Sequence, residues 1–152
     1  DIVMTHNGLA DGLNVFAGYS SISQGTDATT TGDKTQYAVG ATYAVGSITV
    51  GYQYSKDSRN GTNTATSFYE NNAYGISFNV NDDLSISYGV HESERNVHGA
   101  ANATMEASSL QMAYSMGGAT IKIAETSVDS SSYVSTTAGD KDGTTVMLSL
   151  AF

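Results

Sequence analysis

The sequence contains no cysteine, no proline and no tryptophan, and only six of its 152 residues are lysine or arginine. Without cysteine the chain has no disulfide framework, no thiol nucleophile and no cysteine-based zinc site. The formal net charge is −9, and the few cationic residues are scattered instead of forming a basic stripe. This distribution argues against binding to nucleic acid and favours cations or cationic solutes.

Long hydrophobic runs are also missing. No apolar segment approaches the ~20 residues that a membrane-spanning helix needs, and no basic-then-apolar signal segment opens the chain. These absences exclude a helical membrane protein. They do not exclude a β-barrel, because alternation of apolar and polar residues hides its hydrophobicity from an averaged scale and leaves mean hydropathy near neutral.

Alternation of apolar and polar residues is the dominant pattern in the sequence. In residues 143–152, Val146, Leu148, Leu150 and Phe152 would share one face of a strand, because successive side chains point to opposite sides. A terminal aromatic such as Phe152 suits the membrane–water boundary. The same pattern predicts about nine strands in all. The others are expected over 1–7, 12–20, 36–45, 48–55, 73–80, 84–91, 110–116 and 120–124.

The connections between these strands alternate in length. Tight turns are expected near 8–12, 46–47, 81–83 and 117–118, and long polar segments near 21–34, 56–68, 92–106 and 128–143. Tight periplasmic turns and long external loops are typical of outer-membrane barrels. We therefore expect external acidic loops that favour cations at the channel mouth. These loops would contain Asp27, Asp33, Asp57, Glu92, Glu94, Asp129, Asp140 and Asp142.

The two faces of the predicted strands differ in a way that distinguishes fold classes. One face is apolar, whereas the other consists of Gly, Ala, Ser, Thr, Asn and Gln, which cannot fill a dry core but suit a water-filled lumen. The pattern therefore predicts an all-β, antiparallel, up-and-down transmembrane β-barrel with lipid on its apolar face. The alternatives are a soluble β-barrel that binds a ligand, and a structural or adhesive envelope β-barrel without a channel. A closed dry core of apolar residues would favour the soluble alternative.

The number of strands bears on whether these residues can close a barrel. Single-chain bacterial barrels have an even number of strands, and an open edge in hydrocarbon leaves unpaired backbone groups costing several kcal/mol each. We therefore expect residues 1–152 to be the C-terminal part of a single barrel domain. Its N-terminal strands and signal peptide would lie outside this sequence, and the first and last strands should not pair with each other.

Four stretches carry a resemblance to a known family: Gly12-Leu-Asn-Val-Phe-Ala-Gly-Tyr-Ser20, Val50-Gly-Tyr-Gln-Tyr-Ser55, Tyr69-Glu-Asn-Asn-Ala-Tyr-Gly-Ile-Ser-Phe-Asn-Val-Asn-Asp-Asp-Leu84, and Ser149-Leu-Ala-Phe152. They resemble the C-terminal half of general porins of marine alphaproteobacteria. The resemblance implies a homotrimer in the outer membrane of a Gram-negative bacterium, each subunit a barrel of about 16 strands. It also implies contact with lipid and lipopolysaccharide, and passive diffusion of small hydrophilic solutes and ions. In such porins the constricting loop lies in the N-terminal half, so no constriction residue can be transferred.

Several polar residues within the predicted strands are candidates for the channel wall. Lys122 is the only cation in the middle of a predicted strand, and facing lipid at midplane would cost it about 2–4 kcal/mol. A lumen-facing Lys122 that biases ion passage is therefore expected, with a position at the interface or the rim as the alternative. The other pore-lining candidates are Asn14, Gln36, Gln53, Asn79, Ser87, His91 and Gln111, which could also wet the pore without selectivity.

Aromatic residues mark the edges of the predicted apolar band. The expected aromatic girdle consists of Tyr19, Tyr37, Tyr43, Tyr52, Tyr54, Tyr74, Tyr88, Tyr114 and Phe152. Glu125 conflicts with this scheme, because strict alternation puts it on the lipid side. A β-bulge, an early exit from the bilayer or a place in a subunit interface would each resolve the conflict.

The sequence offers little support for catalysis or metal binding. The segment His91-Glu-Ser-Glu-Arg95 has one histidine and two carboxylates at a strand end, and Asp140-Lys-Asp-Gly143 is only a fragment of a calcium-loop pattern. No Ser–His–Asp or paired-carboxylate arrangement with interpretable spacing is present. We therefore expect no metal, no cofactor and no enzymatic activity. Residues 130–140 form a low-complexity polar tract that predicts a solvated loop.

Overall fold

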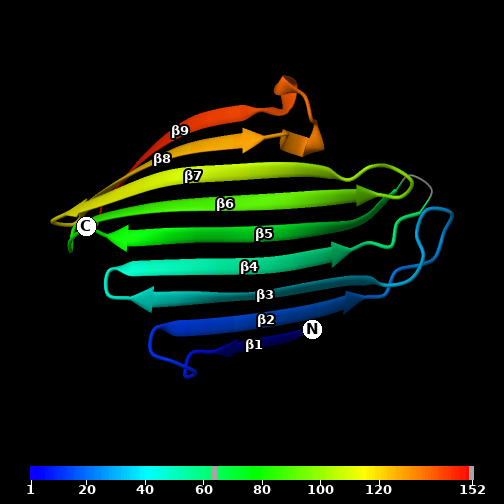
Figure 1. The fold of residues 1–152 in the computed structure, drawn as a ribbon, viewed down its shortest axis with the longest axis horizontal. Coiled ribbons are helices and arrows are strands. Elements are labelled where there is room, and N and C mark those ends of the chain that lie inside the picture. The colour runs from blue at the N-terminus through cyan, green and yellow to red at the C-terminus, as the bar shows by residue number, and fades with distance from the viewer. Residues whose placement is uncertain (63–64, 151–152) are drawn as a thin grey trace.

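The computed structural model describes residues 1–62 and 65–150, which form a single antiparallel β-sheet. Each strand pairs with its neighbours in the chain, so the nine strands run up and down in the order β1 to β9 (Figure 1). Their bounds are β1 Ile2–His6, β2 Leu13–Ile22, β3 Lys34–Val45, β4 Ile48–Ser58, β5 Thr66–Asn79, β6 Leu84–Val97, β7 Ala103–Met116, β8 Ala119–Asp129 and β9 Lys141–Leu150. Two short 3-10 helices, η1 Ser131–Tyr133 and η2 Thr137–Gly139, lie between β8 and β9.

The predicted strands are all present, and the up-and-down order is confirmed. The strand ends are corrected, however, because several strands continue into segments that were expected to be loops. The largest difference is at residues 92–106, where β6 runs to Val97 and β7 begins at Ala103. Glu92 and Glu94 there pair in register with Asn72 and Glu70. Backbone pairing extends these strands although their side chains no longer alternate between apolar and polar.

Two ends of the sheet can still be distinguished. The short-turn end carries the connections 7–12, 46–47, 80–83 and 117–118, and the long-loop end carries 23–33, 59–65, 98–102 and 130–140. Gly46 and Gly117 have φ angles of 59° and 51° in the two-residue turns, a backbone conformation that glycine adopts without strain. The side-chain oxygen of Asn81 accepts hydrogen bonds from the backbone N–H groups of Asp83 and Leu84, both at 2.9 Å, which closes the 80–83 turn.

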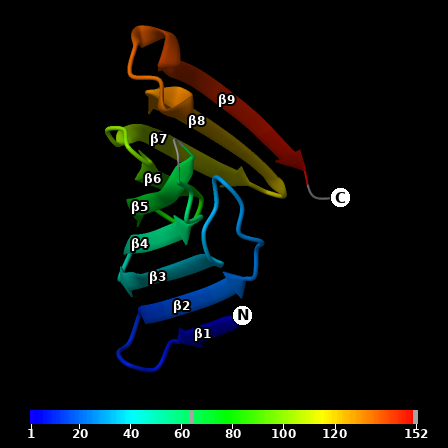
Figure 2. The same cartoon turned by 90° about the vertical axis from the view of Figure 1, so that its right-hand side faces the viewer.

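The described residues form one curved layer, and none of their elements builds a second layer over either face (Figure 2). Among the described residues Val90 is the only hydrophobic side chain that is buried. Val50, Ile76 and Leu148 are 42, 48 and 60% exposed. The apolar residues of the strands therefore do not converge into a closed dry core.

Both edges of the sheet are open. Within the described residues β1 pairs only with β2, and β9 pairs only with β8, so the first and last strands do not pair with each other, as expected. Every residue of β1 and of β9 is exposed. The structure thus shows an open antiparallel sheet of nine strands.

Candidate functional site

The register of the strands assigns each side chain to one of two faces, because residues directly opposite each other in neighbouring strands point to the same side. Val50 lies opposite Tyr43 and Ile76, and Ile76 lies opposite Tyr88. Following these pairs across the sheet defines the apolar face. Its large side chains include Val39, Tyr43, Val50, Tyr52, Tyr74, Ile76, Phe78, Ile86, Tyr88, Leu110, Met112, Tyr114, Ile121, Ile123, Val146 and Leu148, all of them at least one-third exposed.

The opposite side, the polar face, carries all of the predicted pore-lining residues. The register places Asn14, Gln36, Gln53, Asn79, Ser87, His91, Gln111 and Lys122 there. Gln53, Ser87, His91 and Gln111 line one hollow over the middle of the sheet. Lys122 lies in a neighbouring hollow that also touches Ser87 and Gln111. Asn14 and Asn79 lie toward the short-turn end, away from this group. Gln36 lies toward the long-loop end, where it lines a further hollow together with Gln53.

Small residues on the polar face leave much of the sheet surface without projecting side chains. Gly75 lies opposite Gly51 and Gly89, so three neighbouring strands present no side chain at that level. Phe16 is an exception, because its ring lies over Gly40 and leaves no space there for a Cβ atom. This face therefore has room for water beside its polar groups but few large side chains.

The described tyrosines of the predicted girdle, which are all of its members except Phe152, lie on the apolar face. Phe152 lies outside the described residues. Tyr37, Tyr54, Tyr74 and Tyr88 occur on successive strands, each displaced from its predecessor toward the short-turn end. The rings of Tyr37 and Tyr54 are 5.9 Å apart. The row of tyrosines therefore runs obliquely to the strands. Tyr43 and Tyr114 lie nearer the short-turn end.

Carboxylates gather on the apolar side between the tyrosine row and the long-loop end. This acidic margin consists of Glu70, Glu92, Glu94, Glu106, Glu125, Asp129 and Asp142. Of the acids expected in external loops, Glu92, Glu94, Asp129 and Asp142 therefore belong to strands and lie on the apolar side. Asp57 is also a strand residue, on the polar face, whereas Asp27, Asp33 and Asp140 do lie in connections.

Glu125 belongs to this acidic margin. Strands β7, β8 and β9 pair without a register shift, so no bulge turns its side chain to the other face. The hydroxyl of Thr144 donates a hydrogen bond of 2.7 Å to Glu125 Oε2. Of the three explanations offered by the sequence, an early exit from the bilayer and a place in a subunit interface remain.

The acidic margin provides a test of the register itself. Glu92 lies directly opposite Glu106 and has no cation beside it in register. Glu70 also lies opposite a carboxylate, that of Glu94, but Lys56 Nζ at 2.8 Å and the hydroxyl of Tyr54 at 2.8 Å both hold its side chain. Like charges directly opposite each other destabilise a sheet and opposite charges stabilise it, by about 0.2–1 kcal/mol. Glu92→Gln should therefore raise the free energy of unfolding slightly, and Glu70→Gln should lower it. Urea unfolding of the two variants measures this difference, and equal signs would contradict the register.

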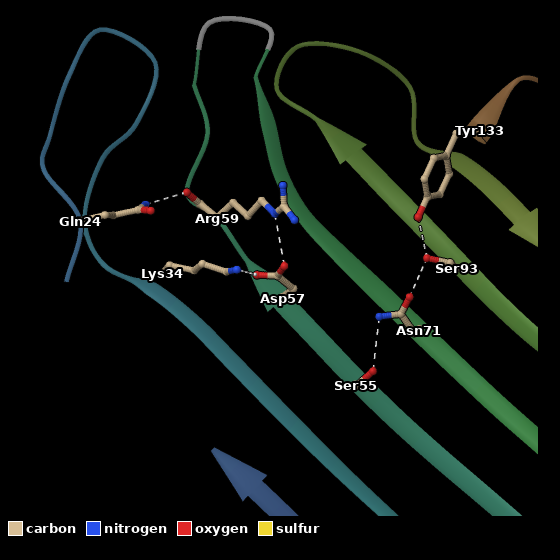
Figure 3. A network of polar contacts seen from close by, with 8 residues as sticks. All are labelled: Gln24, Lys34, Ser55, Asp57, Arg59, Asn71, Ser93 and Tyr133. Atoms are coloured by element: carbon tan, nitrogen blue, oxygen red, sulfur yellow. Dashed lines mark hydrogen bonds and ion pairs between the residues drawn. The ribbon is translucent and has the colours of Figure 1, made fainter. Parts of the chain in front are cut away.

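Most of the carboxylates in the strands lie on the apolar side, whereas most of the cationic residues lie on the polar side. All of the lysines and arginines except Lys56 lie on the polar side, where Asp57 is the only carboxylate among the described strand residues. These cations are Lys34, Arg59, Arg95, Lys122 and Lys141. Lys34 Nζ and Arg59 Nε both reach Asp57, at 3.4 and 3.2 Å (Figure 3). No ion pair of the described residues includes Lys122. The polar face is therefore positively charged, whereas the chain as a whole is acidic.

The loop 23–33 is attached to the beginning of the connection 59–65. The side-chain amide of Gln24 donates to the carbonyl of Arg59 at 3.0 Å, and the backbone N–H of Thr31 donates to the carbonyl of Asn60 at 3.0 Å. Within the loop, the backbone N–H and then the hydroxyl of Thr29 donate to the Asp27 carboxylate, and these bonds hold its pKa below the usual value of 3.8. A lowered pKa means that these bonds stabilise the loop above pH 3.8 and are lost as the pH falls through the folded-state pKa.

Comparisons with known proteins gave no match to a family model, a curated protein or a solved structure. The helices of the described residues are too short to cross a membrane. The same residues contain no cluster of three or more histidine or acidic side chains that could hold a metal ion. The two faces of the sheet are therefore the main indication of function.

Proposed function

We propose that this chain is part of an outer-membrane porin, with lipid against the apolar face and a water-filled channel along the polar face. The channel would allow passive diffusion of small hydrophilic solutes and ions. The observation that carries this proposal is the apolar face itself, which is exposed across the width of the sheet. Soluble monomers rarely expose contiguous apolar patches beyond a few hundred Å². In a membrane this face is not exposed to water, because the hydrocarbon chains of lipid cover it as another protein layer would.

The open edges of the sheet indicate what else the channel needs. Unpaired backbone groups in hydrocarbon cost several kcal/mol each, so β1 and β9 require further strands beside them. We propose that these strands belong to the N-terminal half of the same barrel, which would then contain about 16 strands, as wide porins do. The resemblance to general porins adds the proposal of a homotrimer in contact with lipid and lipopolysaccharide.

The placement of charges changes the expected ion preference. The sequence pattern predicted a cation-leaning mouth, but four of the acids behind that prediction, Glu92, Glu94, Asp129 and Asp142, lie on the apolar side. A positive polar face raises the local concentration of anions in the channel. We therefore propose that the wall formed by these residues favours anions, although acidic residues remain in the loops at the mouth.

A conductance measurement on the complete protein tests the proposed function. Purified protein reconstituted in planar bilayers should raise the current in discrete steps, because each trimer adds its own channels. The alternative of a structural or adhesive envelope protein predicts that the protein inserts without conducting. A soluble ligand-binding protein would not insert at all. Either result would contradict the porin proposal.

A further inference from the structure

The connection between β8 and β9 does not simply arch over the ends of these strands. Its 3-10 helix η1 contacts β7, and the side chain of Tyr133 reaches over that strand to β5 and β6. The Tyr133 hydroxyl is 2.7 Å from the Ser93 hydroxyl (Figure 3). The centroid of the Tyr133 ring is 5.6 Å from that of the Tyr69 ring. The guanidinium of Arg95 lies 4.7 Å from the centre of the Tyr133 ring. All three partners are residues of the polar face.

The contact point of Tyr133 is the driest part of the polar face. Ser93 is 3% exposed and is the only buried polar or charged residue in the described part of the chain. Its hydroxyl donates to Asn71 Oδ1 at 2.6 Å, and Asn71 Nδ2 donates to the Ser55 hydroxyl at 3.3 Å. The hydroxyl of Tyr133 thus joins a chain of hydrogen bonds across β6, β5 and β4. A buried hydroxyl such as that of Ser93 costs free energy when its hydrogen bonds are lost, so these bonds favour the observed position of Tyr133.

The backbone of this connection also has an unusual conformation that its own contacts hold in place. The φ angles of Ser130, Ser132 and Tyr133 are 54°, 59° and 62°. Residues other than glycine rarely adopt this left-handed region. The backbone N–H of Ser130 donates to Asp140 Oδ1 at 3.1 Å and so ties the two ends of the segment together. Gly139 is buried, and the carbonyl oxygen of Val134 occupies the space that a Cβ would need. Such a backbone persists only when its surroundings hold it.

We infer that residues 130–140 are a constricting segment, which Tyr133 pins onto the polar face so that the segment narrows the channel beside Arg95. This inference rests on the proposed function, because it takes the polar face as the channel wall. A segment that lies on the wall reduces the cross-section open to solutes. It therefore limits the size of the hydrophilic molecules that pass. The guanidinium stacked on the Tyr133 ring places a positive charge at the same level.

The constricting segment would act in addition to the loop that the porin resemblance assigns to the N-terminal half. The two are separable by mutation, since Tyr133 and its partners all lie within this chain. Tyr133→Ala removes both the hydrogen bond and the ring contacts, whereas Tyr133→Phe removes only the hydrogen bond. Thr137→Ala serves as the control, because Thr137 is an exposed residue of the same segment.

The first readout is hydrogen–deuterium exchange of the complete protein in lipid or detergent, which needs no channel activity. Tyr133→Ala should increase exchange of the amides in 130–140 by about tenfold or more, since these amides then open locally. Tyr133→Phe should give an intermediate increase, and Thr137→Ala no change. Exchange in Tyr133→Ala equal to that in the control would overturn the inference. The Phe variant keeps this test decisive if the Ala variant fails to fold.

The second readout is permeation. In vesicle swelling, Tyr133→Ala should admit an oligosaccharide near the size limit roughly twofold faster or more, with a smaller effect on a monosaccharide, because restriction grows as solute size approaches pore size. Equal rates for the variant and Thr137→Ala would contradict a constricting role. If the unmodified protein does not conduct but loss of Tyr133 still releases the segment, the porin proposal fails while the attachment of the segment stands. These results separate the two claims.

Discussion

Replacing Ile76 by arginine should lower the free energy of unfolding of the complete protein in lipid by about 2–4 kcal/mol, the cost of a cation on the lipid side near midplane. Ile76 lies within the apolar band of β5, between Val50 and Tyr88 on the neighbouring strands, and it is 48% exposed in the sheet. An exposed strand position in water would tolerate arginine within about 0.5 kcal/mol. The measurement is urea unfolding of the protein folded into lipid vesicles.

Ser77→Arg is the matched control for this prediction. Ser77 is the next residue of β5 and lies on the polar face, opposite Thr49 and Ser87. An arginine there would project into water and should change stability by less than about 1 kcal/mol. Equal losses of stability in the two variants would contradict the assignment of the faces. A larger loss for Ser77→Arg would reverse that assignment.

Lys122→Glu should shift the ion preference of the channel from anions toward cations by severalfold. The substitution changes the wall charge by two units at a mid-strand position for which the described residues form no ion pair. Charges in a confined channel act on passing ions with little screening by competing groups. The measurement is the reversal potential in a salt gradient across a planar bilayer. Lys122→Gln should give a shift in the same direction of about half the size.

Glu106→Gln is the control for a change in net charge that does not lie on the channel wall. Glu106 lies in the acidic margin on the apolar side, opposite Glu92 and Asp129. Its neutralisation changes the net charge of the protein but should leave the reversal potential nearly unchanged, because the sheet separates it from the polar face. A shift with Glu106→Gln and none with Lys122→Glu would place the channel on the other side of the sheet.

The strands and their faces could be predicted because the information is local. A period of two residues defines a strand and assigns its side chains to faces. Val50 and Tyr52 can therefore be assigned to the apolar face, and Gln53 to the polar face, without any tertiary knowledge. The same method failed beyond His91, where polar residues occur on both faces and alternation is lost. Glu92 and Glu94 were therefore assigned to a loop although they continue β6. Extending the alternation by two steps would have placed both on the apolar side.

The attachment of residues 130–140 could not be predicted in this way. A tract of serine, threonine and glycine predicts a solvated loop, but the segment instead contacts the polar face through Tyr133. The partner, Ser93, is 40 residues away in the sequence, and no local pattern encodes a contact at that distance. The only signal was the presence of one large aromatic residue in an otherwise small and polar tract.

The most direct test of a sheet with lipid on one face and water on the other is cysteine scanning along β4. The 152 residues contain no cysteine, so no native thiol among them competes with an introduced one. In lipid vesicles, a membrane-impermeant maleimide added on both sides should label cysteine at positions 49, 53 and 55, which replace Thr49, Gln53 and Ser55 of the polar face. Cysteine in place of Val50, Tyr52 or Tyr54 should react only after the membrane is dissolved and the protein unfolded. Uniform labelling along β4, or labelling at the apolar positions alone, would contradict the proposed arrangement.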